Sequence, residues 1–278
     1  MKSIYDKVSL ETSKNITRKY STSFSFGIFC LSKSIHKPIY NIYGFVRIAD
    51  EIVDSFHEYN KKDLLEEFKI DTYKAIERGI STNPVLNSFQ QVVNEFDIPL
   101  ELIEAFLHSM EMDLGIHDYN QKKYDAYIFG SAEVVGLMCL KVFTKGNESE
   151  YEILKPYAKT LGSAFQKVNF LRDLNADYHT LGRLYFPNIN LDTFNFETKK
   201  EIEKEIEAEF KEALTGIKKL PLNARFGVYV AYIYYINLLK KIQKTSPNSL
   251  LHDRIRIPAH EKISLLLKSY FKYNLKFI

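Results

Sequence analysis

Residues 161–177, Leu-Gly-Ser-Ala-Phe-Gln-Lys-Val-Asn-Phe-Leu-Arg-Asp-Leu-Asn-Ala-Asp, place polar side chains at a regular interval in an otherwise apolar segment. Four residues of an α-helix advance about 400°, so side chains four apart lie about 40° from alignment. Asn169, Asp173 and Asp177 therefore form one stripe along two helical turns. Carboxylates this close repel each other and are costly beside an apolar core. The stripe indicates acids that serve a ligand.

A second acidic pair lies in residues 42–54, Ile-Tyr-Gly-Phe-Val-Arg-Ile-Ala-Asp-Glu-Ile-Val-Asp. Asp50 and Asp54 are four residues apart and again share one helical face. One such pair is usually a solvated surface, but two stripes in apolar helices, each beside an arginine, argue against that. Asp and Asn oxygens suit Mg²⁺, which proteins commonly hold with few carboxylates plus substrate phosphates. Arg47 and Arg172 are placed to contact phosphate oxygens.

The rest of the chain predicts an all-α fold in a single domain covering residues 1–278. Apolar residues recur at helical steps, and period-two alternation typical of strands is scarce, so we expect about ten helices. Most of the eight prolines fall where such helices should begin or end. Residues 39–53 and 226–239 are apolar on nearly every side, which predicts central helices around a cavity. Residues 198–219 alternate Glu and Lys and should lie outside.

Composition limits the function classes. Hydrophobic residues at 45% and charged residues at 26% exclude a disordered chain. Cys30 and Cys139 form no metal-ligand spacing or disulfide framework, which favours a reducing compartment, and we predict a cytoplasmic protein. The N-terminus is too polar for a signal peptide, and the most apolar uncharged run, residues 226–239, is shorter than the roughly 20 residues of a membrane span. No zinc-finger or RNP-type motif is present, so no nucleic-acid partner is expected.

Several motifs resemble those of the squalene/phytoene synthase family of isoprenoid synthases. Ser21-Thr-Ser-Phe24 resembles the family's Ser-x-Ser-Phe motif, and residues 42–54 resemble its first aspartate-rich motif. Residues 161–173, followed by Asp177 and by Gly182-Arg-Leu-Tyr-Phe-Pro187, resemble its second motif over a long, gapless stretch. The segments around Asp113, Tyr119 and residues 127–136 are similar to its central helices. The resemblance therefore extends over most of the chain.

The resemblance implies an isoprenoid synthase helical bundle with a central apolar cavity and an enzyme of the prenyltransferase class. The reaction implied is head-to-head (1′-1) condensation of two prenyl diphosphates. An allylic cation left by departing diphosphate is attacked by the acceptor's double bond, giving a cyclopropylcarbinyl diphosphate that ionises again and rearranges to a hydrocarbon. Mg²⁺ is the implied cofactor, with Mn²⁺ as a substitute. Aromatic rings can stabilise the cations in a dry cavity, and Phe26, Phe45, Phe129 and Phe165 are candidates for its lining.

The same resemblance assigns roles to particular residues. The metal ligands implied are Asp50, Asp54, Asn169, Asp173 and Asp177. The catalytic residues implied are four of these aspartates, Asp50, Asp54, Asp173 and Asp177, together with Tyr43 and Tyr185. The substrate-binding residues implied are Ser21, Ser23, Phe24, Arg47, Gln166, Asn169, Arg172, Tyr234 and Arg254.

Three positions depart from the family pattern. Glu51 stands where many members carry a second Asp, at a modest expected cost because the outer aspartates are the ligands. Glu133 stands where a small residue is usual, so it is either a charge at the cavity rim or a side chain that narrows the cavity. The alignment near Arg254 is less regular, and Arg256 could take its place.

The particular reaction is less sharply indicated. No apolar C-terminal span and no Gly-x-Gly-x-x-Gly motif are present, which favours a synthase that needs no NADPH. Residues 135–139 and 182–187 favour phytoene formation from two geranylgeranyl diphosphates in carotenoid biosynthesis, with a desaturase as the downstream partner. The alternatives are a dehydrosqualene or squalene synthase that uses farnesyl diphosphate, a non-catalytic assembly relative of the fold, and a terpene cyclase or head-to-tail prenyltransferase. The presence of all five acidic-motif positions argues against the non-catalytic relative.

The C-terminal segment is the most basic part of the chain. Residues 240–278 hold nine Lys or Arg and two Asp or Glu, a net charge of +7 in a chain of net charge +3. Lys268, Lys272 and Lys276 recur every four residues, with Leu265, Leu266, Phe271 and Leu275 around them. The pattern is typical of a helix peripheral to the inner, anionic face of a membrane, and equally of a last helix docked on the bundle, which we favour.

Overall fold

In the described part of the chain, the fold is built from helices joined by loops. The computed structural model describes residues 1–115, 119–187, 189 and 194–275. Thirteen α-helices and one turn of π-helix (η1) occur in these residues, so the expectation of an all-α fold is confirmed. The elements are α1 (Lys2–Tyr20), α2 (Thr22–Phe29), α3 (Lys33–Asp54), α4 (Lys61–Arg78), α5 (Pro84–Glu95), α6 (Leu100–Gly115), α7 (Gln121–Ile128), η1 (Phe129–Glu133), α8 (Val134–Phe143), α9 (Glu148–Leu181), α10 (Phe196–Lys219), α11 (Leu222–Lys244), α12 (Pro247–Leu250) and α13 (Ala259–Asn274).

The beginnings of many helices are fixed by local capping. An asparagine side chain accepts hydrogen bonds from backbone N–H groups of the first turn at the start of four helices, α4, α5, α7 and α10. These contacts satisfy donors that a helix leaves without an internal partner. Ser21 caps α2 in the same way, accepting from the Phe24 N–H. The beginnings of these five helices therefore follow from short polar signals.

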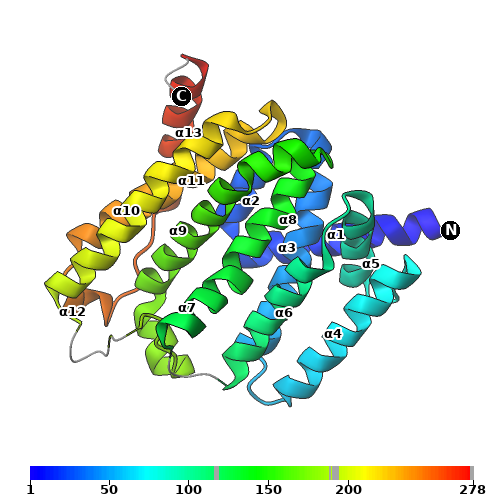
Figure 1. Cartoon of the computed structure of the whole chain (residues 1–278), viewed down its shortest axis with the longest axis horizontal. Helices are drawn as coiled ribbons and strands as arrows, with labels where there is room; N and C mark the ends of the chain where they lie inside the picture. The colour runs from blue at the N-terminus through cyan, green and yellow to red at the C-terminus, as the bar shows by residue number, and fades with distance from the viewer. Residues whose placement is uncertain (116–118, 188, 190–193, 276–278) are drawn as a thin grey trace.

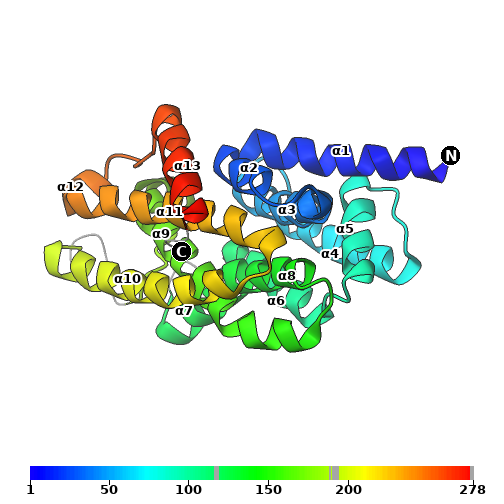
Figure 2. The same ribbon diagram turned by 90° about the horizontal axis from the view of Figure 1, so that it is seen from above.

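The two helices that carry the acidic stripes, α3 and α9, lie in the middle of the bundle. α3 packs against α1, α5, α8 and α6, and its buried residues lie on nearly all sides, as its sequence predicts. α9 packs against α8, η1, α10 and α11. Figures 1 and 2 show α4 and α5 at one end of the bundle and α10 to α13 at the other, with α3 and α9 between them. The acidic stripes are thus carried by the two helices between the ends of the bundle.

Both α3 and α9 make close contacts with neighbouring helices at a glycine. A Cβ atom added at Gly44 of α3 would lie 2.6 Å from the Ser13 Cβ of α1. A Cβ at Gly162 of α9 would lie 2.8 Å from the Ala132 carbonyl oxygen in η1. Real Cβ atoms do not approach so closely, so each helix needs glycine at its crossing point.

Some expectations about individual segments need correction. Pro38 and Pro156 lie inside α3 and α9 rather than at helix ends. Each stands within the first three turns, where the remaining hydrogen bonds and the packing of a long helix outweigh one missing donor. α10 turns most of its Glu and Lys residues outward as predicted, but it buries one face through Ile206 and Phe210, together with the ion pair of Lys199 and Glu203. Cys30 and Cys139 are free thiols.

One helical run of the described residues is long and apolar enough to cross a membrane. It is Gln121–Phe143, which joins α7, η1 and α8, and 67% of its most apolar window is buried inside the protein. This run was not singled out from the sequence, because Lys122, Lys123 and Glu133 interrupt it. Such burial is typical of a core helix, and α8 packs against α3, α6 and α9.

Candidate active site

A large cavity separates the two acidic helices. Its volume is about 920 Å³, and α2, α3, α8, α9, α10 and α11 contribute to its wall. The residues expected at the site line this one cavity, apart from Ser23, whose side chain lies outside the described part of the structure. Those that line it are Ser21, Phe24, Tyr43, Arg47, Asp50, Asp54, Gln166, Asn169, Arg172, Asp173, Asp177, Tyr185, Tyr234 and Arg254. The roles assigned to them remain predictions.

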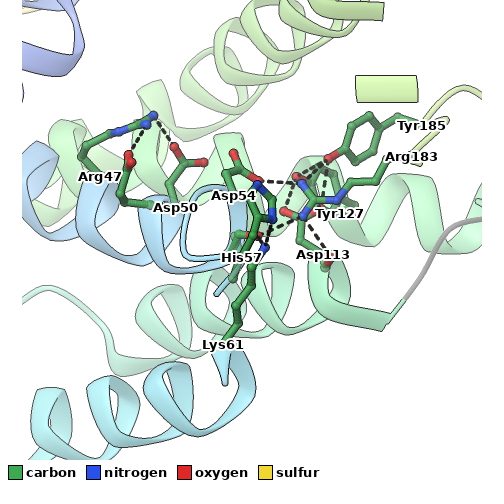
Figure 3. Close-up of polar contacts among 11 residues, drawn as sticks. Arg47, Asp50, Asp54, His57, Lys61, Asp113, Tyr127, Arg183 and Tyr185 are labelled. Atoms are coloured by element: carbon green, nitrogen blue, oxygen red, sulfur yellow. Dashed lines mark hydrogen bonds and ion pairs between the residues drawn. The ribbon is translucent and has the colours of Figure 1, made fainter. Parts of the chain in front are cut away.

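At the first stripe, Arg47 holds two acids of its own helix. Its guanidinium forms ion pairs with Asp50 and Glu51, one turn further along α3 (Figure 3). The guanidinium also lies 4.5 Å from the centre of the Tyr20 ring, a cation–π contact. Glu51 is thus a buried partner of Arg47, which gives the glutamate at this position a defined contact.

Arg183 joins the first stripe to the segment that follows the second. Its Nη1 lies 2.7 Å from Asp54 Oδ1, and its Nη2 donates to the Asp113 carbonyl oxygen at 3.0 Å. Its backbone N–H donates to the Asp177 carbonyl oxygen at 2.8 Å. Figure 3 shows the guanidinium between Asp54 and a buried group formed by Asp113, Tyr127 and Tyr185. This arginine therefore braces one acidic helix against the other.

The buried group below Arg183 consists of one acid and two phenols. The Tyr127 hydroxyl donates to Asp113 Oδ2 at 2.8 Å, and the Tyr185 hydroxyl donates to Asp113 Oδ1 at 3.0 Å. Tyr185 also stacks on Phe170, with ring centres 4.2 Å apart. Because Tyr127 and Tyr185 both line the cavity, the network fixes two aromatic faces at its polar end.

At the second stripe, two arginines converge on one acid. Arg172 forms a bidentate ion pair with Asp173, and Arg254 Nε lies 2.7 Å from Asp173 Oδ1. Asn169 Oδ1 accepts a hydrogen bond from the Tyr235 hydroxyl at 3.2 Å. Within the described residues no Lys or Arg lies within ion-pair distance of Asp177. Arg254 thus reaches the stripe, while Arg256 lines the cavity without such a contact.

The electrostatics of the stripes show an excess of negative charge. Burial, with the charge of Asp54, raises the pKa of Asp50 to about 7, although Arg47 opposes the shift. Burial and the charges of Asp173 and Asp54 raise the pKa of Asp177 to about 8. Asp54 of the first stripe thus acts on Asp177 of the second, which means that both stripes face the same space.

The donor set fits a hard cation shared with a substrate. Carboxylate and amide oxygens from α3 and α9 line one cavity, and the raised pKa values of Asp50 and Asp177 reflect charge that a divalent cation would offset. No group of three acids, His or Cys in the described residues is gathered closely enough to hold a metal by itself. This arrangement suits Mg²⁺, which usually binds one or two carboxylates plus phosphate oxygens.

The remainder of the wall is apolar. Phe24 and Tyr43 lie with ring centres 4.7 Å apart, and Phe165 stacks on Tyr235 at 4.0 Å. Of the four phenylalanines suggested for the lining, only Phe165 belongs to the wall of the large cavity. Phe45 is fully buried in a stack with Phe89, while Phe26 borders a small separate gap and Lys159 lies over the Phe129 ring. Residue type alone does not identify the residues that line the cavity, because phenylalanine also fills the core.

Glu133 can be placed in the same way. It is not part of the cavity wall, although Ser131 and Ala132 beside it are. Its carboxylate pairs with Lys159 of α9 at 3.2 Å, and burial raises its pKa. The suggestion that Glu133 narrows the cavity is therefore wrong, because the side chain points along the helix interface.

Three site residues were missed at the sequence level: Asp113, Tyr127 and Arg183. Asp113 had one available signal, an acid on the apolar face of a helix that otherwise buries Phe106 and Met110. Tyr127 and Arg183 lie in stretches that carry the family resemblance, residues 127–136 and 182–187, but no local pattern assigns either of them a role. They meet Asp113 only through the packing of α6, α7 and the segment after α9.

Comparison with known proteins agrees with this geometry. The sequence model of the squalene/phytoene synthase family matches residues 17–261. The chain is 28% identical to the 4,4′-diapophytoene synthase of Staphylococcus haemolyticus over 197 residues, 68% of this chain and 66% of that protein. It is 26% identical to the phytoene synthase of Thermus thermophilus over 277 residues, 92% of this chain and 90% of that one. It matches 57% of the length of the Mycobacterium tuberculosis phytoene synthase, at 26% identity over 64% of this chain.

Solved structures show the same fold. A dehydrosqualene synthase superimposes with a TM-score of 0.82 at 21% identity, covering 97% of this chain and 98% of that one. A squalene synthase from Alicyclobacillus acidocaldarius gives a TM-score of 0.75 at 18% identity, covering 87% and 95%. The family model matches well over half of the chain, a range that includes the residues of both acidic stripes, and the chain therefore belongs to the squalene/phytoene synthase family.

Proposed function

We propose that this protein is a prenyltransferase that joins two prenyl diphosphates head to head (1′-1), through a cyclopropylcarbinyl diphosphate, with Mg²⁺ as cofactor. The observation that carries the proposal is the pair of acidic stripes on α3 and α9, which face one cavity of about 920 Å³. One end of that cavity offers acids and arginines for diphosphate and metal, and the remainder is apolar and suits prenyl chains.

The two stripes would bind the diphosphate groups. Bound Mg²⁺ would neutralise the diphosphate and make it a better leaving group. Asp50, Asp54, Asn169, Asp173 and Asp177 would hold the cation. Arg47, Arg172 and Arg254 pair with acids of the stripes in the structure and would contact phosphate oxygens once a cation takes over those acids.

The cavity wall would protect the cation that remains when diphosphate departs. The rings of Phe24, Tyr43, Phe165 and Tyr235 present π faces there, and such faces attract positive charge. Burial raises the pKa of the Tyr43 hydroxyl well above its usual value, so this phenol stays protonated and is a weak nucleophile. Exclusion of water then favours attack by the acceptor's double bond over hydrolysis.

For the substrate, we propose geranylgeranyl diphosphate, with phytoene as product and no NADPH requirement. Two sequence segments support this choice, residues 135–139 and 182–187, and relatives named phytoene synthase match up to 93% of this chain. The Staphylococcus relative, named 4,4′-diapophytoene synthase, favours farnesyl diphosphate as the second candidate.

The test is to incubate the purified protein with Mg²⁺ and either the C15 or the C20 diphosphate and to identify the hydrocarbon by mass spectrometry. We expect a C40 hydrocarbon from the C20 substrate without NADPH. A C30 product alone would favour the farnesyl alternative. A head-to-tail or cyclic product, or none with either substrate, would contradict the proposed reaction.

A further inference from the structure

The last helix, α13, is attached to the bundle along one side only. In the described residues its main partner is α11, with Leu265 packed against the core. Figure 1 shows α13 rising from the side of α10 and α11, and Figure 2 shows it projecting from the bundle beside α2. The expected docking of this helix is therefore present, but it uses only one face.

The opposite face of α13 exposes an apolar stripe. Ile263, Leu267, Phe271 and Leu275 follow each other at intervals of four residues, and 54%, 54%, 62% and 65% of each is exposed. A surface helix normally turns polar residues outward. The stripe differs from the sequence-based expectation in one respect, since Leu265 faces the protein while Ile263 and Leu267 face outward.

Basic residues flank the stripe. Lys268 and Lys272 are exposed and lie beside Leu267 and Phe271, while Lys276 lies outside the described residues. The segment from residue 240 to the C-terminus carries a net charge of +7. Two copies of the protein joined through this face would bring like charges together, which opposes self-association. An anionic surface complements both the charge and the apolar stripe.

The inner face of α13 covers a thin part of the wall of the candidate active site. A small gap lies between α2, α11 and α13, bordered by Phe26 and Leu266. Gly27, Ala231, Tyr234 and Lys262 border both this gap and the large cavity. The wall between the apolar cavity and the exterior is therefore thin at the place that α13 covers.

We propose that α13 docks this protein on an anionic lipid bilayer, with Ile263, Leu267, Phe271 and Leu275 entering the interface and Lys268 and Lys272 facing the headgroups. The thin wall then lies only one helix away from the bilayer, so an apolar product that passes beside α13 can enter lipid without crossing bulk water. The exit role rests on the proposed function, whereas the docking does not.

The chain contains no tryptophan, which allows a direct test. The variant Phe271→Trp places the protein's single tryptophan in the stripe. Tyr59→Trp is the matched control, because Tyr59 is also an exposed aromatic residue and lies between α3 and α4 rather than on α13. With phosphatidylglycerol vesicles, and without Mg²⁺ or substrate, we expect a blue shift and quenching by brominated lipid for Phe271→Trp only. Added salt or zwitterionic vesicles should weaken both.

A second pair of variants guards against an effect of the fluorophore. Leu267→Asp/Phe271→Asp should reduce the fraction sedimenting with these vesicles at least about tenfold, since burial of a Leu or Phe is lost, whereas Tyr59→Asp should not. Equal sedimentation of both variants, or a dimer in solution that the double variant dissociates, would overturn the docking proposal.

The exit role has its own readout. Vesicles should raise the steady-state rate of the unaltered protein but not of Leu267→Asp/Phe271→Asp, with single-turnover product formation the same in both. If vesicles bind but leave the steady-state rate unchanged, the exit role is wrong while docking stands. If no product forms at all, the proposed function fails and the vesicle results still decide the docking.

Discussion

In α3 each aspartate of the stripe has an arginine partner, Arg47 for Asp50 and Arg183 for Asp54. In α9, Arg172 and Arg254 both contact Asp173, and in the described residues Asp177 has no such partner. The pKa of Asp177 is accordingly raised to about 8, while burial and the charge of Asp54 raise that of Asp50 to about 7 in spite of Arg47. The same four-residue spacing thus leaves both aspartates of α3 paired and one aspartate of α9 unpaired, and this uncompensated acid, Asp177, marks where a cation stabilises the site most.

The largest expected effect is the loss of either stripe. Asp50→Ala and Asp173→Ala should each lower kcat at least about 100-fold, because charge developing on the leaving diphosphate loses its electrostatic stabilisation. The helical content should stay the same, since both acids face the cavity. Product formation and far-ultraviolet circular dichroism measure the two quantities. Unfolding of these variants would mean that the acids serve structure, contrary to our account.

The brace between the stripes is expected to matter most for stability. Arg183→Met leaves the buried Asp113 and the half-buried Asp54 without their shared cation, and we expect about 2–4 kcal/mol less free energy of unfolding. Lys159→Met is the matched control, since it breaks the partly exposed pair with Glu133 and should cost less than about 1 kcal/mol. Urea unfolding compares them. Equal losses would show that Arg183 does not brace the two helices.

The uncompensated acid should make the metal-free protein sensitive to pH. Folding raises the pKa of Asp177 from 3.8 to about 8, so the folded state binds this proton more tightly than the unfolded chain. The resulting stabilisation is complete below about pH 4 and is lost as the pH rises through about 8. We expect urea unfolding in EDTA to show about 1–3 kcal/mol less stability at pH 9 than at pH 5.

Two additions sharpen this pH test. Asp177→Asn should flatten the profile, whereas Asp54→Asn should flatten it only in part, because it removes one of several causes that raise the pKa values of Asp177 and Asp50. Mg²⁺ should stabilise the protein more at pH 8 than at pH 6, since it competes with protons for the same oxygens. A profile that is unchanged in Asp177→Asn would contradict the assignment.

The smallest effect is expected at Glu51, the acid that follows Asp50 in α3. It pairs with Arg47 rather than lining the cavity. Glu51→Gln keeps a hydrogen-bond acceptor for Arg47, so we expect about 1 kcal/mol in stability and a change in kcat of no more than about threefold. Steady-state kinetics beside those of Asp50→Asn checks this. A loss as large as in Asp50→Asn would make Glu51 part of the ligand-binding set.

The sequence predicts the parts of the site that depend on local spacing. Asp50, Asp54, Asp173 and Asp177 follow from helical periodicity alone, since four-residue steps place them on one face. Asp113 and Arg183 are 70 residues apart and meet through tertiary packing, which no local pattern encodes. Likewise, the few residues around Glu133 could not show that its side chain lies along the interface with α9.

The same distinction holds for the fold. Central and outer helices were predicted correctly for α3 and α10, because hydrophobic periodicity reports which faces are buried. Pro38 and Pro156 were expected at helix ends, and there the packing of a long helix outweighs a local preference. The small gap beside α13 depends on how three helices meet, so only the structure reveals it.

The most direct test of the central claim is calorimetric binding of an unreactive prenyl thiodiphosphate to the unaltered protein, Asp54→Asn, Asp177→Asn and the double variant, with and without Mg²⁺. If both stripes hold one metal–diphosphate group, binding should require Mg²⁺, and the double variant should lose little more affinity than either single variant. Tight binding without Mg²⁺, or losses that simply add, would contradict a shared site.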